Sequence, residues 1–553
     1  MSKVLTLLAL LLFLGVDTQV FSAAAADHYE WREKKFTLVL EQLQRSLRES
    51  LPELESMIDL SQRPGLSAPD LHSNSELCQT HFNEALLYLF RLSTYQMSKE
   101  KTYTMFIEQL RAALNTRYYQ THQFEGLDIP LVDMIQTVSM QLYQGINIQP
   151  YLNKLWQTIA VHGGYELGPR AQNKNLFPSD QNYSSIERLY FIRSRLENLL
   201  SIYRGIKSGK SLLSVTFSER TKDILFGGVT WLSFDPASMG NVPYVKYRLR
   251  RSSGEHELTY IRMPTPTLNS DKSASICPEF KAYLAYLKNR GYKHLYLNFQ
   301  DNIRPQLGKI KSARQFVKAL GIGNESFRAE AVEMLAQSPE FRDTAIVITF
   351  SKDSRFYKQN SIQEKEIMSA RTFIERYLRT MFDLRNEGFY VPPSWRTANS
   401  SARQDVRQYL QNIHQWFFKN KPFLDWHERR DFIEISYFFI GDYASRGVFS
   451  ANQTCKTGID RAGTANTMTF LMSLVMFAHG KAFEQAGFEQ LLASFEAMLF
   501  SDAIMAKKRE IKRSRLLRFR SAAMRMLDEM IDNPDLLDDI AQAIGNTQPI
   551  LGE

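Results

Sequence analysis

Cysteine is scarce in this sequence, which contains only Cys78, Cys277 and Cys455 among 553 residues. Three cysteines cannot form a disulfide framework for a chain of this size, and no Cys-x-x-Cys spacing offers a zinc site. Glycine and proline are also infrequent, with 26 and 19 residues, which excludes collagen-like and low-complexity chains. The hydrophobic content of 44% is that of a globular protein, so at least one cysteine requires another explanation.

Long apolar runs are absent beyond the first 26 residues, so the sequence predicts no transmembrane segment there. Residues 1–26 include Lys3, continue through 13 mostly apolar residues, Val4–Val16, and end in small residues before Asp27. This apolar core is shorter than the ~20 residues that a membrane-spanning helix needs. We therefore predict that residues 1–26 are a cleaved signal peptide and that the mature protein is exported.

Charge is unevenly distributed, although its net value is only +9. Nine basic residues and one acid lie in Lys507–Arg525, and the seven charged residues after it are all acidic. This segment is either an amphipathic helix that binds an anionic membrane surface or a solvated face that pairs with the acids after it. A second basic face is predicted on a strand, where Lys246, Arg248 and Arg250 alternate. The remaining positive charge is spread thinly, so we expect no nucleic-acid partner.

Hydrophobic periodicity divides the chain into two regions. Apolar residues recur at three- and four-residue steps across residues 27–210, which predicts an all-helical N-terminal region. Residues 211–553 contain a predicted hairpin, formed by Tyr244–Leu249 and Leu258–Arg262, and then alternating helices and strands. These are helix Pro278–Asn289, strand His294–Asn298, helix Glu325–Gln337 and strand Thr344–Thr349. The order is typical of an α/β domain with a central sheet.

One segment combines the residue types that phosphoryl transfer to a thiolate requires. It is Cys455-Lys-Thr-Gly-Ile-Asp-Arg461, between a predicted strand, Val448–Ala451, and a predicted helix, Thr464–His479. A loop of this length can direct successive backbone N–H groups toward a phosphate, and the helix N-terminus adds its positive dipole. Arg461 can bind two phosphate oxygens with its planar guanidinium. We therefore predict that Cys455 is a nucleophile and that Arg461 binds the phosphoryl group.

This segment resembles the active-site loop of the Cys-x5-Arg phosphatases. Lys456 and Gly458 follow the cysteine as in the phosphatase-and-tensin-homologue family, which has Cys-Lys-Ala-Gly-Lys-Gly-Arg. The inositol phosphate phosphatase effectors secreted by enteric pathogens have Cys-Lys-Ser-Gly-Lys-Asp-Arg, which matches six of seven positions if Thr457 stands for serine. The resemblance implies a protein-tyrosine-phosphatase-like fold, a phosphocysteine intermediate, and a phosphate-binding loop of Lys456, Thr457, Gly458, Ile459 and Asp460.

Two positions differ from the loops that this segment resembles. Ile459 occupies the place of their second lysine. Ala462 occupies the place of a Ser or Thr whose hydroxyl, in those families, bonds the sulfur and helps the phosphocysteine break down. Thr464 and Thr467 are the hydroxyls nearest in sequence that could replace it.

The resemblance also implies a general acid, usually an aspartate some 30 residues before the cysteine and just ahead of a helix. Asp425 lies 30 residues before Cys455 and is the first candidate. Asp431 is the second candidate, and Asp460 inside the loop is the third. The alternative for Asp425 is a structural role as the N-cap of the helix that follows it.

These features together predict an exported phosphatase that uses no metal and no cofactor and acts on phosphoinositides or inositol polyphosphates. The resemblance to secreted effectors also implies delivery to a host cell. Two alternatives stay open, namely a protein tyrosine or dual-specificity phosphatase and an inactive scaffold that binds phosphate.

Overall fold

The computed structural model describes residues 37–43, 45, 74–91, 99–122, 130–145, 148, 183–208, 242–251, 257–269, 273–301, 325–359, 366–383, 388–480, 484–507, 510–545 and 547–551. The predicted signal peptide, residues 1–26, lies outside the described residues.

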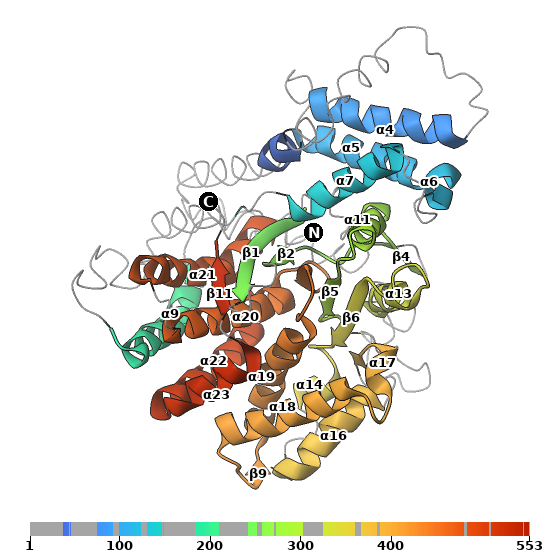
Figure 1. Cartoon of the computed structure of the whole chain (residues 1–553). Coiled ribbons are helices and arrows are strands. Elements are labelled where there is room, and N and C mark those ends of the chain that lie inside the picture. The colour runs from blue at the N-terminus through green and yellow to red at the C-terminus, as the bar shows by residue number, and fades with distance from the viewer. Residues whose placement is uncertain are drawn as a thin grey trace, which may run out of the picture.

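A mixed seven-stranded sheet forms the centre of the described structure (Figure 1). In chain order its strands are β1 (Tyr244–Arg251), β2 (Leu258–Arg262), β5 (His294–Asn298), β6 (Ala345–Phe350), β8 (Phe389–Tyr390), β10 (Ser450–Thr454) and β11 (Thr547–Ile550). Their order in the sheet is β11-β1-β2-β10-β5-β6-β8. The inner strands β2, β10, β5 and β6 are parallel, whereas β1 pairs antiparallel with β2 and β11, and β8 pairs antiparallel with β6. The strand that precedes Cys455, β10, therefore lies in the middle of the sheet.

Two short antiparallel ribbons accompany the sheet. One joins β3 (Thr267–Asn269) to β4 (Ala274–Ile276). The other joins β7 (Met368–Ser369) to β9 (Phe423–Leu424). The β7–β9 ribbon leads directly into the long helix α19 (Trp426–Ala444).

Side chains of the sheet alternate between two hydrophobic cores, as the two-residue period of a strand requires. In β5, Tyr296 belongs to the first core, whereas Leu295 and Leu297 belong to the second. The first core is completed by α4 (Asn74–Arg91), α5 (Lys99–Leu114), α6 (Arg117–His122), α7 (Pro130–Gln144), α11 (Pro278–Asn289) and α13 (Glu325–Gln337).

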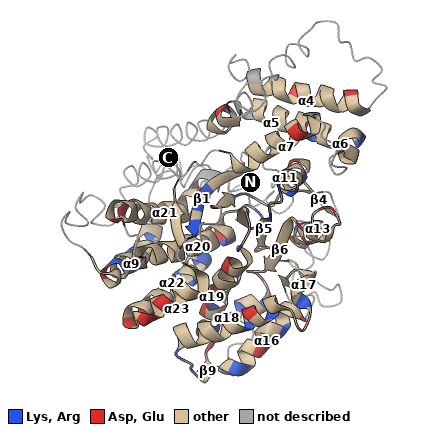
Figure 2. Cartoon of the chain, viewed as in Figure 1, with Lys and Arg blue, Asp and Glu red and all other residues tan. Residues whose placement is uncertain are grey.

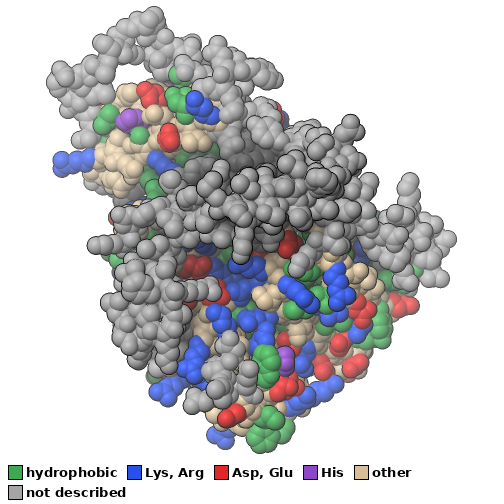
Figure 3. All heavy atoms as spheres, turned by 180° about the vertical axis from the view of Figure 1, so that it is seen from behind, with side chains coloured by type: hydrophobic (Ala, Val, Ile, Leu, Met, Phe, Trp, Pro, Cys, Tyr) green, Lys and Arg blue, Asp and Glu red, His purple; other side chains and the backbone are tan. Residues whose placement is uncertain are grey.

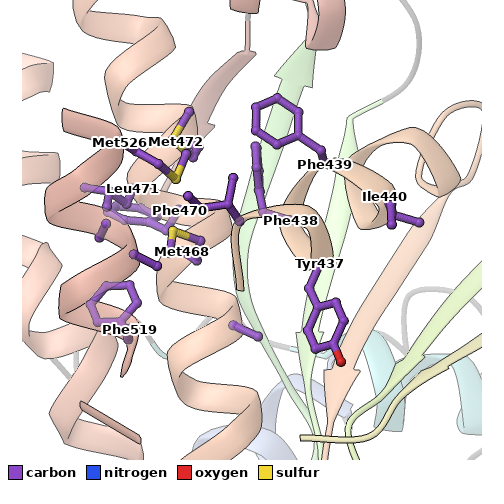
Figure 4. Close-up of a cluster of buried hydrophobic side chains, with 14 of the residues drawn as sticks. Tyr437, Phe438, Phe439, Ile440, Met468, Phe470, Leu471, Met472, Phe519 and Met526 are labelled. Carbon is purple, nitrogen blue, oxygen red and sulfur yellow. The ribbon is translucent and has the colours of Figure 1, made fainter. Parts of the chain in front are cut away.

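The second core lies on the other face of the sheet. It is completed by α9 (Ser185–Ser208), α14 (Arg355–Lys358), α16 (Ala370–Phe382), α17 (Pro393–Arg396), α18 (Ser401–Phe418), α19, α20 (Asp460–His479), α21 (Gln485–Lys507), α22 (Arg513–Asp532) and α23 (Asp535–Ile544). Figure 4 shows Met468 and Met472 of α20 next to Phe519 and Met526 of α22. The described chain thus has a helix–sheet–helix architecture, which is the α/β character with a central sheet that the sequence predicts.

Helices from the N-terminal part of the chain pack on both faces of the sheet. Every element that the structure describes between residues 74 and 208 is a helix. Helices α5 and α7 pack against α11, whereas α9 packs against α20, α21 and α22 (Figure 1). The predicted division of the chain at residue 210 stays a prediction.

Most predicted elements in the sheet region have the observed bounds or nearly so. Helices α11 and α13 and strands β2 and β5 begin and end where the sequence predicts, and β6 is shifted by one residue. The basic face predicted on β1 is wrong, because a β-bulge interrupts the alternation at Lys246. The Lys246 side chain is buried and forms an ion pair with Asp502 of α21, whereas Arg248 and Arg250 are exposed and pair with Glu257.

The basic segment Lys507–Arg525 covers the end of α21 and the first part of α22. Its apolar residues Ile511, Leu516 and Phe519 are buried in the second core. Any membrane contact of this segment would therefore have to be made by its exposed side chains alone. Figure 2 shows basic residues along α22 and acidic residues on α23, and Figure 3 shows both signs of charge on the opposite face of the molecule.

None of the helices among the described residues combines the length and the apolarity that a membrane-spanning segment requires.

Candidate functional site

The predicted phosphate-binding loop follows the central strand β10 and leads into α20. Cys455 comes directly after β10 and is 2% exposed, and Arg461 lies in the first turn of α20. The Gly458 N–H donates to the Cys455 carbonyl at 3.0 Å, which closes a tight turn inside the loop. The loop therefore lies at the carboxyl end of a central parallel strand and at a helix N-terminus, where anions bind in open α/β sheets.

The segment after β2 packs against this loop and fixes its shape. Arg262 Nη2 donates to the Thr457 carbonyl at 2.9 Å, and the Thr265 hydroxyl donates to the Cys455 carbonyl at 3.3 Å. A β-carbon on Gly458 would lie 2.5 Å from the Met263 carbonyl oxygen, and the Gly458 φ angle is +67°. Only glycine fits this close approach and this conformation.

Arg461 is the centre of a buried charge cluster. Its Nη1 and Nη2 donate to the two carboxylate oxygens of Glu325 at 2.7 and 2.6 Å, and Nη1 also donates to Asp353 Oδ2 at 2.9 Å. Burial opposes the positive charge, but Glu325, Cys455 and Asp353 outweigh it and raise the pKa of Arg461 well above its usual value. The bidentate contact with Glu325 holds the guanidinium plane in one orientation.

Asp353 lies on the loop between β6 and α14, at the same edge of the sheet as Cys455. Its Oδ2 faces Arg461, and its Oδ1 accepts from Arg515 Nη2 of α22 at 2.7 Å. Burial acts to raise the pKa of this carboxyl, but Arg461 and Arg515 overcome that effect and lower it. The Glu325 pKa is lowered as well, because Arg461 outweighs the effect of burial.

The remaining loop residues differ in exposure. Ile459 is buried, whereas Lys456 and Thr457 are partly exposed at the rim of the loop. Asp460 Oδ1 accepts from the Lys512 backbone N–H at 3.0 Å. The third candidate for the acid is thus engaged in holding the start of α22.

The two threonines that could replace the missing hydroxyl at Ala462 are engaged elsewhere. Thr464 Oγ1 donates to the backbone carbonyls of Asp460 and Arg461, and Thr467 Oγ1 donates to the Gly463 carbonyl at 2.8 Å. In this conformation neither hydroxyl is directed at the Cys455 sulfur.

Asp425 is a helix N-cap, which is the structural role that stood as the alternative to its role as the general acid. Its Oδ1 accepts from the Glu428 N–H at 2.8 Å, and the Glu428 carboxylate accepts from the Asp425 N–H, which forms a capping box for α19. The residue of α19 that reaches the β6 loop is Glu434, which pairs with Lys352 beside Asp353. Glu434 lies nine positions after Asp425, which corresponds to about 14 Å along the α19 axis. The structure therefore gives no support to Asp425 as the acid.

Asp431 is also directed away from the loop. Its Oδ2 accepts from Arg525 Nε at 3.2 Å. Arg525 lies ten residues beyond Arg515 on α22, about 15 Å along the helix axis. Burial raises the pKa of Asp431, although Arg525 opposes this effect. None of the described contacts links the Asp431 carboxyl to Cys455.

The structure thus brings Cys455, Arg461 and the predicted loop together and adds three residues outside the predicted site: Glu325, Asp353 and Arg515. Asp353 meets one condition applied to Asp425, since it lies on a loop just ahead of a helix. It lies 102 residues before Cys455 rather than about 30, so the spacing rule misses it. No signal in the sequence joins Glu325 or Arg515 to the loop.

Cys78 and Cys277 are buried. Among the described residues, no group of three or more His, Cys, Asp or Glu side chains is arranged to hold a metal ion.

Comparison with protein-family models, curated proteins and solved structures finds no match to this chain.

Proposed function

We propose that this protein is an exported phosphatase with a protein-tyrosine-phosphatase-like domain, in which Cys455 is the nucleophile. The observation that supports this most is the contact between the Arg461 guanidinium and Glu325 beside the buried Cys455, in a loop after the central strand. A fixed guanidinium, loop N–H groups and a helix N-terminus together stabilise a phosphoryl group in its transition state.

We propose Asp353 as the general acid in place of Asp425. It lies at the same sheet edge as Cys455, and its Oδ2 contacts Arg461, which would bind the phosphoryl oxygens. In the first step the thiolate forms the S–P bond, the P–O bond of the ester breaks, and Asp353 gives its proton to the leaving oxygen. In the second step Asp353 takes a proton from water, which attacks phosphorus and releases the Cys455 thiolate.

Substrate binding supplies the proton that this role requires. Without substrate, Arg461 and Arg515 lower the pKa of Asp353, so the carboxylate is charged. An incoming phosphate replaces Asp353 on Arg461 and adds negative charge beside it, which raises the pKa of the carboxyl. Phosphate monoester and proton are therefore bound together, and we expect kcat/KM to fall as the pH rises above the acidic range.

The substrates that we propose are phosphoinositides or inositol polyphosphates. Their support is the loop sequence, which has Lys456 directly after the nucleophile, and the partial exposure of Lys456 at the rim. A cation at this place suits a ligand with several phosphates. Export and delivery to a host cell remain proposals that rest on the sequence of residues 1–26 and on the loop resemblance.

The test is phosphate release by the chain from Asp27 onward, measured with phosphoinositides, inositol polyphosphates and phosphotyrosine peptides. We expect release that is abolished in Cys455→Ser and retained in Cys78→Ser, because the Cys78 thiol lies in the first core, where it donates to the Ala113 carbonyl. Preference for phosphotyrosine peptides would replace the proposed substrate class by protein phosphatase activity. Equal release by wild type and Cys455→Ser would refute the cysteine mechanism.

An inactive phosphate-binding scaffold is the second candidate function. It is favoured by Ala462 together with Thr464 and Thr467, whose hydroxyls donate to backbone carbonyls. In that case calorimetry would show phosphate binding by wild type while release stays at zero. Restored release in Ala462→Ser would show that only the hydroxyl is missing.

A further inference from the structure

The start of α22 touches both loops of the candidate site at once. The Lys512 N–H donates to Asp460 of the nucleophile loop. One turn later, Arg515 Nη1 donates to the Lys352 carbonyl at 2.6 Å and Nη2 donates to Asp353 Oδ1 at 2.7 Å. The two loops belong to different strands, β6 and β10, which are separated by β5 in the sheet. This helix therefore links them from outside the sheet.

The position of α22 is itself fixed by the second core. Its residues Leu516 and Phe519, adjacent to Arg515 in sequence and along the helix, are 0% and 1% exposed. The helix packs against α9, α19 and α20, and Figure 4 shows Phe519 among the side chains of this core. The Arg515 guanidinium also lies over the Tyr357 ring of α14, 5.8 Å from its centroid. These contacts leave Arg515 little freedom to move away from Asp353.

The Asp353 carboxylate is divided between two arginines. Oδ2 faces Arg461, whose guanidinium would hold the substrate phosphate, and Oδ1 faces Arg515 and, at 3.6 Å, Lys358 Nζ of α14. The Glu325 carboxylate on Arg461 is the negative charge beside Asp353. When phosphate takes over Arg461, the contact of Oδ1 with Arg515 can persist. Oδ2 then remains the oxygen that faces the leaving group.

We propose that Arg515 is a positioning residue that holds Asp353 at the nucleophile loop and selects which of its oxygens transfers the proton. This inference rests on the proposed function, in which Asp353 is the acid. Arg515 belongs to α22 and not to the Cys-x5-Arg motif, so the basic segment near the C-terminal end of the chain contributes to the site through this side chain and through the Lys512 backbone N–H.

Two substitutions at position 515 separate charge from geometry. Arg515→Gln removes the positive charge, which raises the pKa of Asp353, so the fall of kcat at high pH should move to higher pH. The same change loosens the carboxylate, so we expect kcat at the pH optimum to fall roughly tenfold to hundredfold, while KM rises by no more than the several-fold that weaker anion binding causes. Arg515→Lys keeps the positive charge but loses the planar guanidinium. The fall of kcat at high pH should therefore stay at its wild-type position, while kcat is partly recovered relative to Arg515→Gln.

The matched control is Arg520→Gln on the same helix. Arg520 Nε donates to the Leu196 carbonyl of α9, away from both loops. We expect neither kcat nor its pH dependence to change in this variant. If Arg515→Gln lowers kcat equally at every pH, and the pH at which kcat falls does not shift, Arg515 has a merely structural role and the proposal is overturned.

A double-mutant cycle tests whether Arg515 acts through Asp353. In an Asp353→Asn background, Arg515→Gln should cause little further loss of kcat, because the group that it positions is already gone. Multiplicative losses would show that the two residues act independently, which would overturn the inference but leave the proposed phosphatase activity intact.

Anion binding gives a measurement that does not depend on turnover. We expect sulfate, which stays doubly charged over this pH range, to bind Arg515→Gln several-fold more weakly than wild type at neutral pH, by calorimetry. Without Arg515, Asp353 keeps Arg461 and Lys358 as cationic partners and competes harder with the anion for Arg461. The difference should disappear at acidic pH, where Asp353 is protonated. Wild type that binds sulfate in this way but releases no phosphate would refute the phosphatase activity and leave only the positioning of Asp353 by Arg515, and equal sulfate affinities would refute the role of Arg515.

Discussion

Gly458 is the loop residue at which the backbone leaves no space for a side chain. A methyl group there would meet the Met263 carbonyl oxygen at 2.5 Å and would have to occupy a φ of +67°. We expect Gly458→Ala to distort the loop, abolish phosphate release and lower the free energy of unfolding by about 1–3 kcal/mol. Phosphate release and urea denaturation of the same preparation would measure both effects.

Gly463 provides the control for this substitution. It lies two residues after the motif, inside α20, and a β-carbon added there meets no atom within 4 Å. Gly463→Ala should therefore retain activity and gain up to about 1 kcal/mol of stability from its higher helix propensity. Similar losses in both variants would mean that the close contact with Met263 does not determine the loop's shape.

His294 makes the interior of the sheet sensitive to pH. It is fully buried in β5, accepts from the Ser450 hydroxyl through Nδ1 and donates to Asn452 Oδ1 through Nε2 in the tautomer that satisfies both contacts. Burial lowers the pKa of His294 from 6.5 to about 4, although the contact with Asn452 opposes this. The unfolded chain therefore takes up a proton at a higher pH than the folded chain does.

The sign of the resulting pH effect follows from this difference. Above pH 6.5 His294 is neutral in both states, and between 6.5 and about 4 only the unfolded state is protonated. We expect this residue to remove about 3 kcal/mol of stability as the pH falls through that interval. Denaturant unfolding across the pH range should show a shallower decline in His294→Gln than in wild type. The exposed His427 serves as control, and an unchanged slope in His294→Gln would contradict the expectation.

At the level of elements, the sequence predicts the strands and helices of the sheet region well but not the long-range contacts, for physical reasons. Buried strands such as β5 and helices such as α13 depend on local periodicity, so their bounds can be predicted. The bulge at Lys246 depends on a buried partner, Asp502, more than 250 residues away. Local patterns do not contain that information.

Asp353, which we propose as the acid, is not apparent from the sequence for a similar reason. Asp425 has both the expected spacing from Cys455 and a following helix, but these local features are also those of an N-cap, which is the role it has. Helices α14, α16, α17, α18 and α19 lie between β6 and β10 in sequence and separate Asp353 from the cysteine by 102 positions. Only the parallel pairing of β6 with β5 and of β5 with β10 brings the two residues to one edge.

The whole molecule depends on the N-terminal helices to cover one face of the sheet layer. Tyr143 of α7 stacks on Tyr283 of α11 with ring centroids 5.4 Å apart, and Arg111 of α5 pairs with the buried Glu279. We expect a chain that begins at residue 183 to expose the apolar outer face of α11 and to aggregate, because that face has no other cover among the described elements. Size-exclusion chromatography with light scattering would measure this.

Supplying the missing part in trans is the control for that truncation. Co-expression of residues 27–145 should restore a monodisperse complex, since α4–α7 can cover the same face when they are supplied as a separate chain. A truncated chain that is monomeric, folded and active on its own would show that the helices are an appended unit and not part of the fold.

The pairing of β1 with β11 has a consequence for how the protein is made. Arg251 lies opposite Thr547, so the edge of the sheet joins positions about 300 residues apart. The proposed site needs Arg262 early in this span and Arg515 late in it. During translation the nucleophile loop emerges from the ribosome before the helix that contacts it, and the site cannot be completed until both have left the exit tunnel. If residues 1–26 direct export and the chain is the phosphatase that we propose, export of an unfinished chain would move it across the membrane before a competent site exists, and the producing cell's own phosphorylated metabolites would be spared.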